Sequence, residues 1–209
     1  MISSRLGFRE RRYLVLGRAA GPEMQAARRL LDLGAAVHIV CAEALEPALE
    51  PCRLAVGAEP DAAGWLNALS DRVLQGAVIA PWKTGPVPLL GADPQTWEAR
   101  LRSNVLAPLQ LIQGLAASGR FAAGASLVLC MDDASGGDLA AAAASAGLQQ
   151  ALFQGRRELL QAGIRVNFLS GQHADAGPML FLLSDASRWM TGSRMVADRG
   201  LSLRKVPLS

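Results

Sequence analysis

The sequence of 209 residues is poor in the side chains that most often transfer protons. It contains one tyrosine, Tyr13, and two histidines, His38 and His173. Only two of its 21 basic residues are lysines, Lys83 and Lys205. Because Tyr13 begins the first apolar run of the chain, a mechanism that needs a tyrosine acid on a later helix is excluded.

Long apolar runs are lacking as well. No run reaches the ~18 residues that a membrane helix needs, and the apolar run near the N-terminus is too short for a signal peptide, so we expect no membrane association. The three cysteines, Cys41, Cys52 and Cys130, lie far apart and are odd in number. This pattern argues against a disulfide framework or a metal site and favours a reducing, cytoplasmic location.

The charge and aromatic content argue against nucleic acid as a partner. The net charge is only +3, and aromatic residues make up 5% of the chain. Nucleic-acid binding favours a basic stripe with interleaved aromatic side chains. The densest basic cluster, which contains Arg5, Arg9, Arg11 and Arg12, is interpreted as part of a solvated N-terminal arm over residues 1–12.

The chain does contain a regular alternation of two patterns. Short continuous apolar runs suit strands that are buried on both faces, and stretches with helical spacing follow them. The alternation predicts an α/β fold: a Rossmann-like, doubly wound, mostly parallel sheet with helices on both faces, in a single domain with a tail over 201–209. Strands are expected at 13–16, 37–41, 53–56 (weak), 77–80, 126–131, 164–169 and 194–197. Helices are expected around Met24, Ala27, Leu30 and Leu31, and at 62–74, 96–117 (kinked at Pro108), 139–162 and 178–184.

The first loop, from Gly17 to Glu23, is where this fold places a dinucleotide phosphate. Glycines let the backbone approach the phosphate, and the helix N-terminus supplies N–H groups and a positive dipole end. Gly17 and Gly21 are present, but Pro22 and Glu23 occupy the turn into the helix. The Glu23 carboxylate competes for the site of an anion, whereas Arg18 attracts one. Two interpretations stay open: phosphate binding and a purely structural turn.

Further candidates lie in loops at the expected carboxyl edge of the sheet. Cys41 stands where an acid normally receives the ribose hydroxyls, so the sequence does not select between the two nicotinamide coenzymes. Asp132 and Asp133 follow a buried strand and are either an acid–base pair or turn and helix-cap residues. His173 is either a loop residue without a role or the base of a hydrolase or lyase that uses the same aspartates.

The C-terminal half carries five specific segments: 102–108 (RSNVLAP), 163–167 (GIRVN), 181–185 (FLLSD), 190–192 (MTG) and 196–200 (VADRG). On these segments the chain resembles the short-chain dehydrogenase/reductase family over nearly its whole length. The resemblance implies the fold strongly and the activity only weakly, because one fold hosts many functions.

The chemistry that this resemblance implies uses an asparagine, a serine, a tyrosine and a lysine. The tyrosine is the acid and base, the lysine lowers its pKa and holds the nicotinamide ribose, and the serine positions the substrate oxygen. Only Asn104 matches, because the other three positions fall at Asp132, Ala142 and Ala146. By this resemblance the chain is a degenerate member without the catalytic serine, tyrosine and lysine.

The same resemblance places a vestigial or weak site for NAD or NADP in the loops after the strands. The chain crosses from Gly171 to Pro178 in six residues, which leaves little material for a lid over a substrate. Whether the groove is open, or plugged by Glu23, Pro81 and Trp82, depends on the structure. The implied coenzyme-binding residues are Gly17, Arg18, Gly21, Pro22, Cys41, Ala80, Ser170 and Gly171.

We therefore predict a non-catalytic relative, a pseudoenzyme that keeps the scaffold and binds a partner, itself or a small ligand. The helices over 96–117 and 139–162 correspond to the pair that builds the family's dimer interface. A homodimer or homotetramer through them is expected, and an intact homologue is the other partner considered. The alternative is an active NAD(P)-dependent oxidoreductase in which Asp132 or Asp133 acts as the acid.

Overall fold

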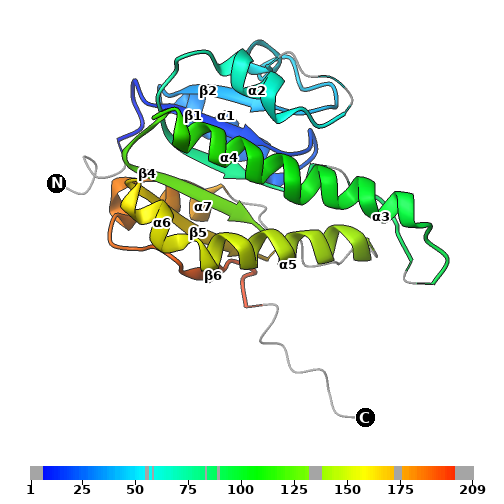
Figure 1. Ribbon diagram of the computed structural model, residues 1–209. Coiled ribbons are helices and arrows are strands. Elements are labelled where there is room, and N and C mark those ends of the chain that lie inside the picture. Colours follow the sequence, from blue (N-terminus) through cyan, green and yellow to red (C-terminus); the bar gives the residue numbers. More distant parts are fainter. Residues whose placement is uncertain are drawn as a thin grey trace.

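The computed structural model describes residues 7–54, 57, 59–82, 84–88, 90–131, 138–171 and 176–200. This part of the chain forms one six-stranded parallel sheet with the strand order β2-β1-β3-β4-β5-β6. The predicted Rossmann-like α/β fold is confirmed (Figure 1). The strands are β1 (Arg12–Leu16), β2 (Ala36–Val40), β3 (Leu74–Ile79), β4 (Phe121–Cys130), β5 (Ile164–Ser170) and β6 (Arg194–Val196). The helices are α1 (Pro22–Asp32), η2 (Glu50–Cys52), α2 (Ala62–Leu69), α3 (Pro94–Leu101), η3 (Arg102–Leu106), α4 (Ala107–Ala117), α5 (Leu139–Gln154), α6 (Arg156–Gln161), α7 (Gly177–Leu183) and η4 (Asp185–Ser187).

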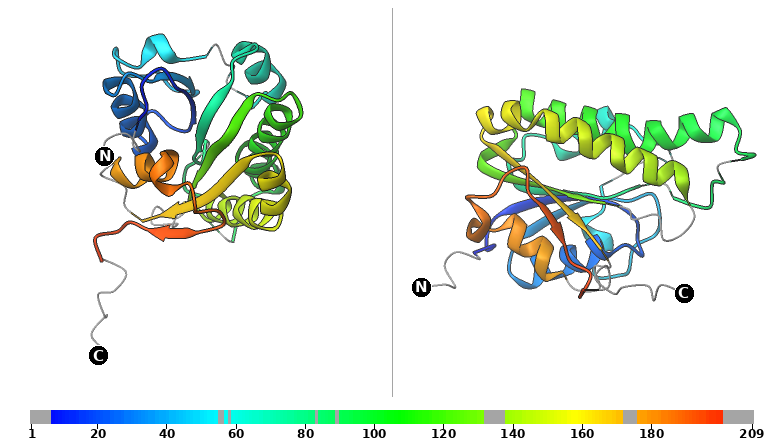
Figure 2. Two further views of the ribbon diagram at one scale, coloured as in Figure 1. Left: turned by 90° about the vertical axis from the view of Figure 1, so that its left-hand side faces the viewer. Right: turned by 90° about the horizontal axis from the view of Figure 1, so that it is seen from below.

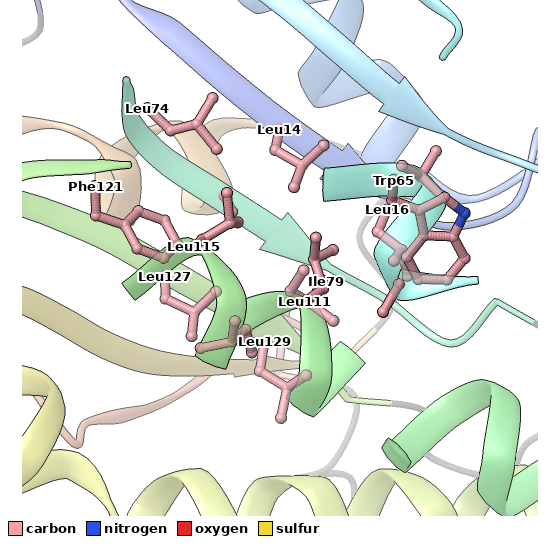
Figure 3. Close-up of a cluster of buried hydrophobic side chains, with 14 of the residues drawn as sticks. Leu14, Leu16, Trp65, Leu74, Ile79, Leu111, Leu115, Phe121, Leu127 and Leu129 are labelled. Atoms are coloured by element: carbon pink, nitrogen blue, oxygen red, sulfur yellow. The ribbon is translucent and has the colours of Figure 1, made fainter. Parts of the chain in front are cut away.

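Helices cover both faces of the sheet, and each face has its own apolar cluster (Figure 2). Leu14 and Leu16 of β1 point into the cluster beneath α2, α4 and α5, where Trp65 is 1% exposed (Figure 3). Tyr13 and Val15 point to the opposite face, beneath α1 and α7. Successive side chains of a strand alternate between faces, so a strand buried on both faces is apolar at every position.

The described part of the predicted N-terminal arm contacts the domain. Arg12 is the first residue of β1, and Phe8 is 3% exposed with its ring 5.8 Å from that of Tyr13. Arg11 pairs with Asp185 at 2.6 Å. Residues 7–11 are therefore packed on the domain. Among the described residues, no helix combines the length and the apolar content that crossing a bilayer requires.

The helix predicted over 96–117 starts earlier and contains a wide turn. It begins at Pro94, and η3 is a π-helical segment in which the N–H of Ala107 bonds to the carbonyl of Arg102. Pro108, in the first turn of α4, has no N–H to offer the carbonyl of Asn104. A wider turn at this point replaces the predicted kink and buries the Asn104 side chain within it.

Three predicted boundaries are wrong. The helix predicted over 139–162 is broken at Gly155, which ends α5 and begins α6. The helix predicted over 62–74 ends at Leu69, because Ser70 adopts a positive φ of 54° and the next apolar residues belong to β3. The weak strand predicted over 53–56 is reduced, in its described part, to one bridge between Arg53 and Ile39.

The segments 163–167 and 181–192 bond to one another at the start of β5. The Arg165 side chain, 5% exposed, donates to the carbonyl oxygens of Ser187 at 2.8 Å and Met190 at 3.3 Å. The Asn167 amide donates to the Met190 carbonyl at 3.0 Å and accepts from the Ser193 N–H at 3.1 Å. These residues hold the chain between α7 and β6 against the sheet, so their role is structural.

Candidate functional site

The loops after β1, β2, β3 and β5 meet at the carboxyl edge of the sheet, beside the point where the strand order reverses between β1 and β3. Open α/β sheets bind ligands at this edge. The sequence-predicted coenzyme residues lie at a strand end here or in the loop that follows it, except Pro22, which is the first residue of α1, and their role stays a prediction. They are Gly17, Arg18, Gly21, Pro22, Cys41, Ala80, Ser170 and Gly171.

The side chain of Glu23 fills the inside of the glycine loop, residues 17–21. Glu23 is 1% exposed, and its Oε1 accepts a 2.7 Å hydrogen bond from the backbone N–H of Arg18. A Cβ atom at Gly17 or at Gly21 would overlap the Glu23 carboxylate. The two glycines therefore make room for this carboxylate, which takes a place that glycines in such loops leave to a phosphate.

A second carboxylate bonds to the loop from the end of β2. Oε2 of Glu43 accepts a 2.7 Å hydrogen bond from the N–H of Ala19. The N–H of Gly17 bonds to β2 at 3.1 Å, and the N–H of Gly21 bonds to the carbonyl of Arg18 at 2.9 Å. Four amides of the loop are thus bonded within the chain, two of them to carboxylates.

The first turn of α1 offers little more to an anion. Pro22 has no N–H, the N–H of Met24 donates to the Gly21 carbonyl at 3.1 Å, and the N–H of Glu23 acts on its own carboxylate, whose pKa it lowers. A pyrophosphate needs free N–H groups and the positive end of the helix dipole. In this arrangement the loop does not fit a dinucleotide phosphate, because four of its N–H groups are bonded within the chain and two carboxylates accept bonds from it.

The electrostatics of Glu23 reflect its burial. Desolvation raises the pKa of Glu23, and the N–H groups of Glu23 and Arg18 and the Arg18 guanidinium only partly counter this effect. Glu43 raises the pKa further. A phosphate placed in the loop would be repelled at short range by the buried Glu23 carboxylate, where the dielectric constant is low.

The Arg18 side chain spans the crevice. Its Nη1 donates a 2.9 Å hydrogen bond to Oγ1 of Thr84, in the loop after β3. This bond ties together the two loops that flank the reversal of strand order. The anion that the sequence predicts for Arg18 is replaced here by a threonine hydroxyl and by the nearby charge of Glu23.

Asn104, the one tetrad position that matches, makes a structural contact. Its Oδ1 accepts a 2.9 Å hydrogen bond from the N–H of Trp82, and the Trp82 ring packs edge-on against Trp65 with centroids 5.1 Å apart. Trp82 therefore belongs to the core beneath α2 and does not plug the crevice. Of the three candidate plugs, Glu23 fills the loop, while Pro81 is half-buried beside Trp82.

Helix α5 carries the two positions where the resemblance implies a tyrosine and a lysine. Ala142 is half-buried and Ala146 is exposed, one turn further along the helix. Tyr13 is fully buried in β1, on the α1 and α7 face, where burial raises its pKa. The methyl groups at these two helix positions supply neither a proton nor a positive charge.

Asp138, directly before α5, is not among the sequence-predicted site residues. Its side chain is 5% exposed, accepts from the N–H of Ala141 at 2.9 Å and from the N–H of Gly85 at 2.6 Å, and lies 3.5 Å from Nε of Arg100. Asp138 thus caps α5 and ties it to the loop after β3. The available signal is an aspartate immediately before an alanine-rich helical stretch.

Three predicted candidates cannot be placed at this edge. Asp132, Asp133 and His173 lie outside the described residues. The roles considered for them, acid–base pair, turn or cap residues and loop base, stay predictions.

The geometry defines a doubly wound fold in which carboxylates of the chain itself accept hydrogen bonds from the glycine loop after β1. No protein-family model and no curated protein matches the chain, but solved structures do. A short-chain dehydrogenase family protein from Francisella tularensis has a TM-score of 0.78 at 19% identity and covers 93% of this chain and 100% of its own. An NADH-dependent reductase complexed with NAD (TM-score 0.75, 19% identity) covers 93% and 98%, and BdcA in complex with NADPH (0.75, 16%) covers 92% and 95%.

The fold is therefore that of the short-chain dehydrogenases/reductases, as the sequence resemblance implied. At these identities the likeness concerns the fold, and activity has to be argued from the site.

Proposed function

We propose that this protein is a catalytically inactive relative of the short-chain dehydrogenases/reductases and uses the fold as a binding scaffold. The observation that carries the proposal is the closed glycine loop, in which Glu23 and Glu43 accept hydrogen bonds from the N–H groups of Arg18 and Ala19. A chain that satisfies these donors with its own carboxylates has little affinity left for a pyrophosphate.

The α5 positions support the same proposal. General acid–base catalysis contributes typically ~10²–10⁴-fold to a rate, and positioning of the reactants contributes more. With alanine at 142 and 146, α5 supplies neither the proton donor nor the lysine that lowers its pKa. Hydride transfer at an enzymatic rate would then lack both the proton donor and the lysine.

The binding surface that we propose is formed by α4 and α5, and its occupant is a second copy of the chain. Neither helix contains a charged residue, although charged residues make up 19% of the sequence. Interface centres are depleted in charge, and a symmetric dimer brings the same patch of both copies together. A mainly apolar groove of about 440 Å³ lies between α4 and α5 and reaches α6, where Glu158 lines it; its apolar lining includes Leu109, Ile112, Ala116, Ala151, Leu152 and Leu159.

Titration calorimetry with NAD, NADH, NADP and NADPH tests the closed loop. We expect no binding to the wild-type protein at millimolar coenzyme. The double variant Glu23→Gly/Glu43→Ala frees two amides and restores a glycine in the turn, so binding should appear in it. The control Glu46→Ala removes an acid that pairs with Arg28 and should behave as wild type. Micromolar coenzyme binding by the wild type would contradict the proposal.

Sedimentation equilibrium tests the helical interface. Ala143→Glu places a charge on the exposed face of α5, whereas the control Ala63→Glu makes the same change on the exposed side of α2. We expect a wild-type dimer that dissociates only in the α5 variant. A wild-type monomer at every concentration would contradict self-association. Capture of an intact homologue through the same face would replace the second copy by that homologue.

The second candidate is an active nicotinamide-dependent oxidoreductase. It is favoured by the fold similarity to proteins that bind NAD and NADPH, and by Asn104 at the matching position. In this case Asp132 would donate the proton, and its pKa would have to be raised toward neutrality. Turnover of a carbonyl substrate that is lost in Asp132→Asn and kept in the exposed control Asp71→Asn would establish this candidate.

A further inference from the structure

Three arginines and an exposed tryptophan lie near the edge of the sheet that ends in β6; we call Arg156, Arg188, Trp189 and Arg194 the β6 patch. Trp189 is 86% exposed, and the Arg188 guanidinium lies 5.3 Å from its ring centroid. Arg156 and Arg194 both approach the Phe153 ring, with guanidinium-to-centroid distances of 4.1 and 5.8 Å.

The patch is one surface because Arg156 packs against the loop that carries Trp189. A Cβ atom built at Gly192, in that loop, would meet the Arg156 side chain. The side chains of Arg165 and Asn167 in β5 fix this loop, because both donate hydrogen bonds to the Met190 carbonyl. Trp189 is therefore presented on an anchored backbone, so little conformational entropy is lost when it is covered.

Strand β6 offers unpaired backbone groups beside the patch. It pairs with β5, and within the described residues no strand lies on its other side (Figure 2). The carbonyl of Ser193 and the N–H of Ala197 bond to β5. Backbone groups alternate in direction along a strand, so those of Arg194 and Val196 face outward and can pair with an added strand.

The positive charge of the β6 patch indicates which kind of partner it binds. Asp185, on which Arg188 acts, is already paired with Arg11, and Arg165 and Arg188 also lower its pKa. The β6 patch itself holds three arginines and no carboxylate. A second copy of the chain placed by a two-fold axis would bring arginine against arginine, which disfavours self-association at this edge.

We propose that the β6 patch docks an extended acidic segment of a partner protein. The partner's backbone pairs with the outer edge of β6, its carboxylates face Arg188 and Arg194, and an apolar side chain covers Trp189. Tryptophan and arginine are the residue types in which binding energy concentrates at protein interfaces. This surface is separate from the α4–α5 face and does not depend on the coenzyme loop.

The probe is a dye-labelled peptide of alternating glutamate and valine, titrated with the full chain at low ionic strength and followed by fluorescence anisotropy. We expect binding that weakens as salt is added. Arg188→Glu/Arg194→Glu should weaken it by at least about tenfold. The control Arg29→Glu/Arg102→Glu changes the net charge equally at exposed arginines outside the patch and should keep wild-type affinity. Trp189→Ala, at an exposed position, should weaken binding without changing the circular dichroism spectrum.

Three outcomes would overturn the proposal. The first is no binding of the peptide by the wild-type chain. The second is equal loss in the patch and control variants, which would mean that only net charge matters. The third is patch-dependent binding of duplex DNA, or of vesicles that contain phosphatidylserine, in preference to the peptide.

Discussion

Arg165 and Glu23 are both buried charged side chains that bond to backbone groups, and they lie at opposite ends of the sheet. Arg165, near the start of β5, donates to carbonyl oxygens of the chain between α7 and β6. Glu23, beyond the end of β1, accepts from the N–H of Arg18. Arg165 stands where the family resemblance implies an arginine, whereas Glu23 stands where it implies a glycine.

This difference shows that the chain keeps the residues that hold the fold together and replaces those that would bind a coenzyme. The C-terminal segments that resemble the family are those that hold the last strand and its loops to the sheet. At the carboxyl edge, where the resemblance implies a coenzyme and a proton donor, the chain places its own carboxylates and methyl groups. Burial lowers the pKa of Arg165 and raises the pKa of Glu23, so both charges are desolvated, and both are compensated by backbone groups.

The largest expected effect on stability is at Arg165, near the start of β5. Arg165→Ala leaves the buried Ser187 carbonyl without its donor, removes one hydrogen bond each from the Ser184 and Met190 carbonyls and leaves a cavity, so we expect the free energy of unfolding to fall by about 3–5 kcal/mol. Denaturant unfolding measures it, with the exposed Arg102→Ala as control, for which the change should stay within about 0.5 kcal/mol. A loss at Arg165 no larger than in the control would show that the C-terminal network does not hold the fold.

The second largest loss of stability is expected when Asp138 is replaced. Asp138→Ala removes the cap of α5 and the acceptor of the Gly85 N–H, so a loss of about 2 kcal/mol is expected. Asp93 is the matched control, because it caps α3 through the Thr96 N–H in an exposed setting. Asp93→Ala should cost clearly less than Asp138→Ala, because its cap is exposed to solvent. Equal losses would mean that the link from Asp138 to the loop after β3 contributes nothing.

Much of the fold could be predicted because each doubly buried strand is a continuous apolar run. The predicted strands in the regions of β1, β2, β3, β4, β5 and β6 are confirmed in their order. In its described part the weak strand at 53–56 is a single bridge, because so short an apolar run does not reveal whether a neighbouring strand is available for pairing. The end of α2 was misplaced because Leu69 and Leu74 are both fully buried, one on the helix and the other on the strand.

Less of the candidate site than of the fold could be predicted from the sequence. The competition between Glu23 and an anion could be predicted, since the two are close in the sequence and share one turn. The hydrogen bond from Ala19 to Glu43 joins residues 24 apart, and the bond from Gly85 to Asp138 joins residues 53 apart. Such contacts depend on how loops from different strands meet, which hydrophobic periodicity does not encode.

The pH dependence of stability tests the carboxyl edge. Because the pKa of Glu23 is raised above its ordinary value of 4.5, the folded chain binds this proton more tightly than the unfolded chain. The contribution of Glu23 is therefore most favourable below 4.5 and is lost as the pH rises through the raised value. We expect the stability of Glu23→Gln, relative to wild type, to increase across this window. The exposed control Glu98→Gln should follow the wild-type curve, and a pH-independent difference at Glu23 would contradict the burial argument.

The smallest effect on stability is expected at Glu43, and it gives the sharpest contrast with Arg165. Glu43 is exposed and makes one hydrogen bond to the loop, so Glu43→Ala should change the free energy of unfolding by less than about 0.5 kcal/mol. It should nevertheless free the Ala19 N–H, and calorimetry with inorganic pyrophosphate should detect weak binding that the wild type lacks. If the loss of stability approached that of Arg165→Ala, Glu43 would be part of the scaffold, and the division between a structural end and a closed ligand end of the sheet would fail.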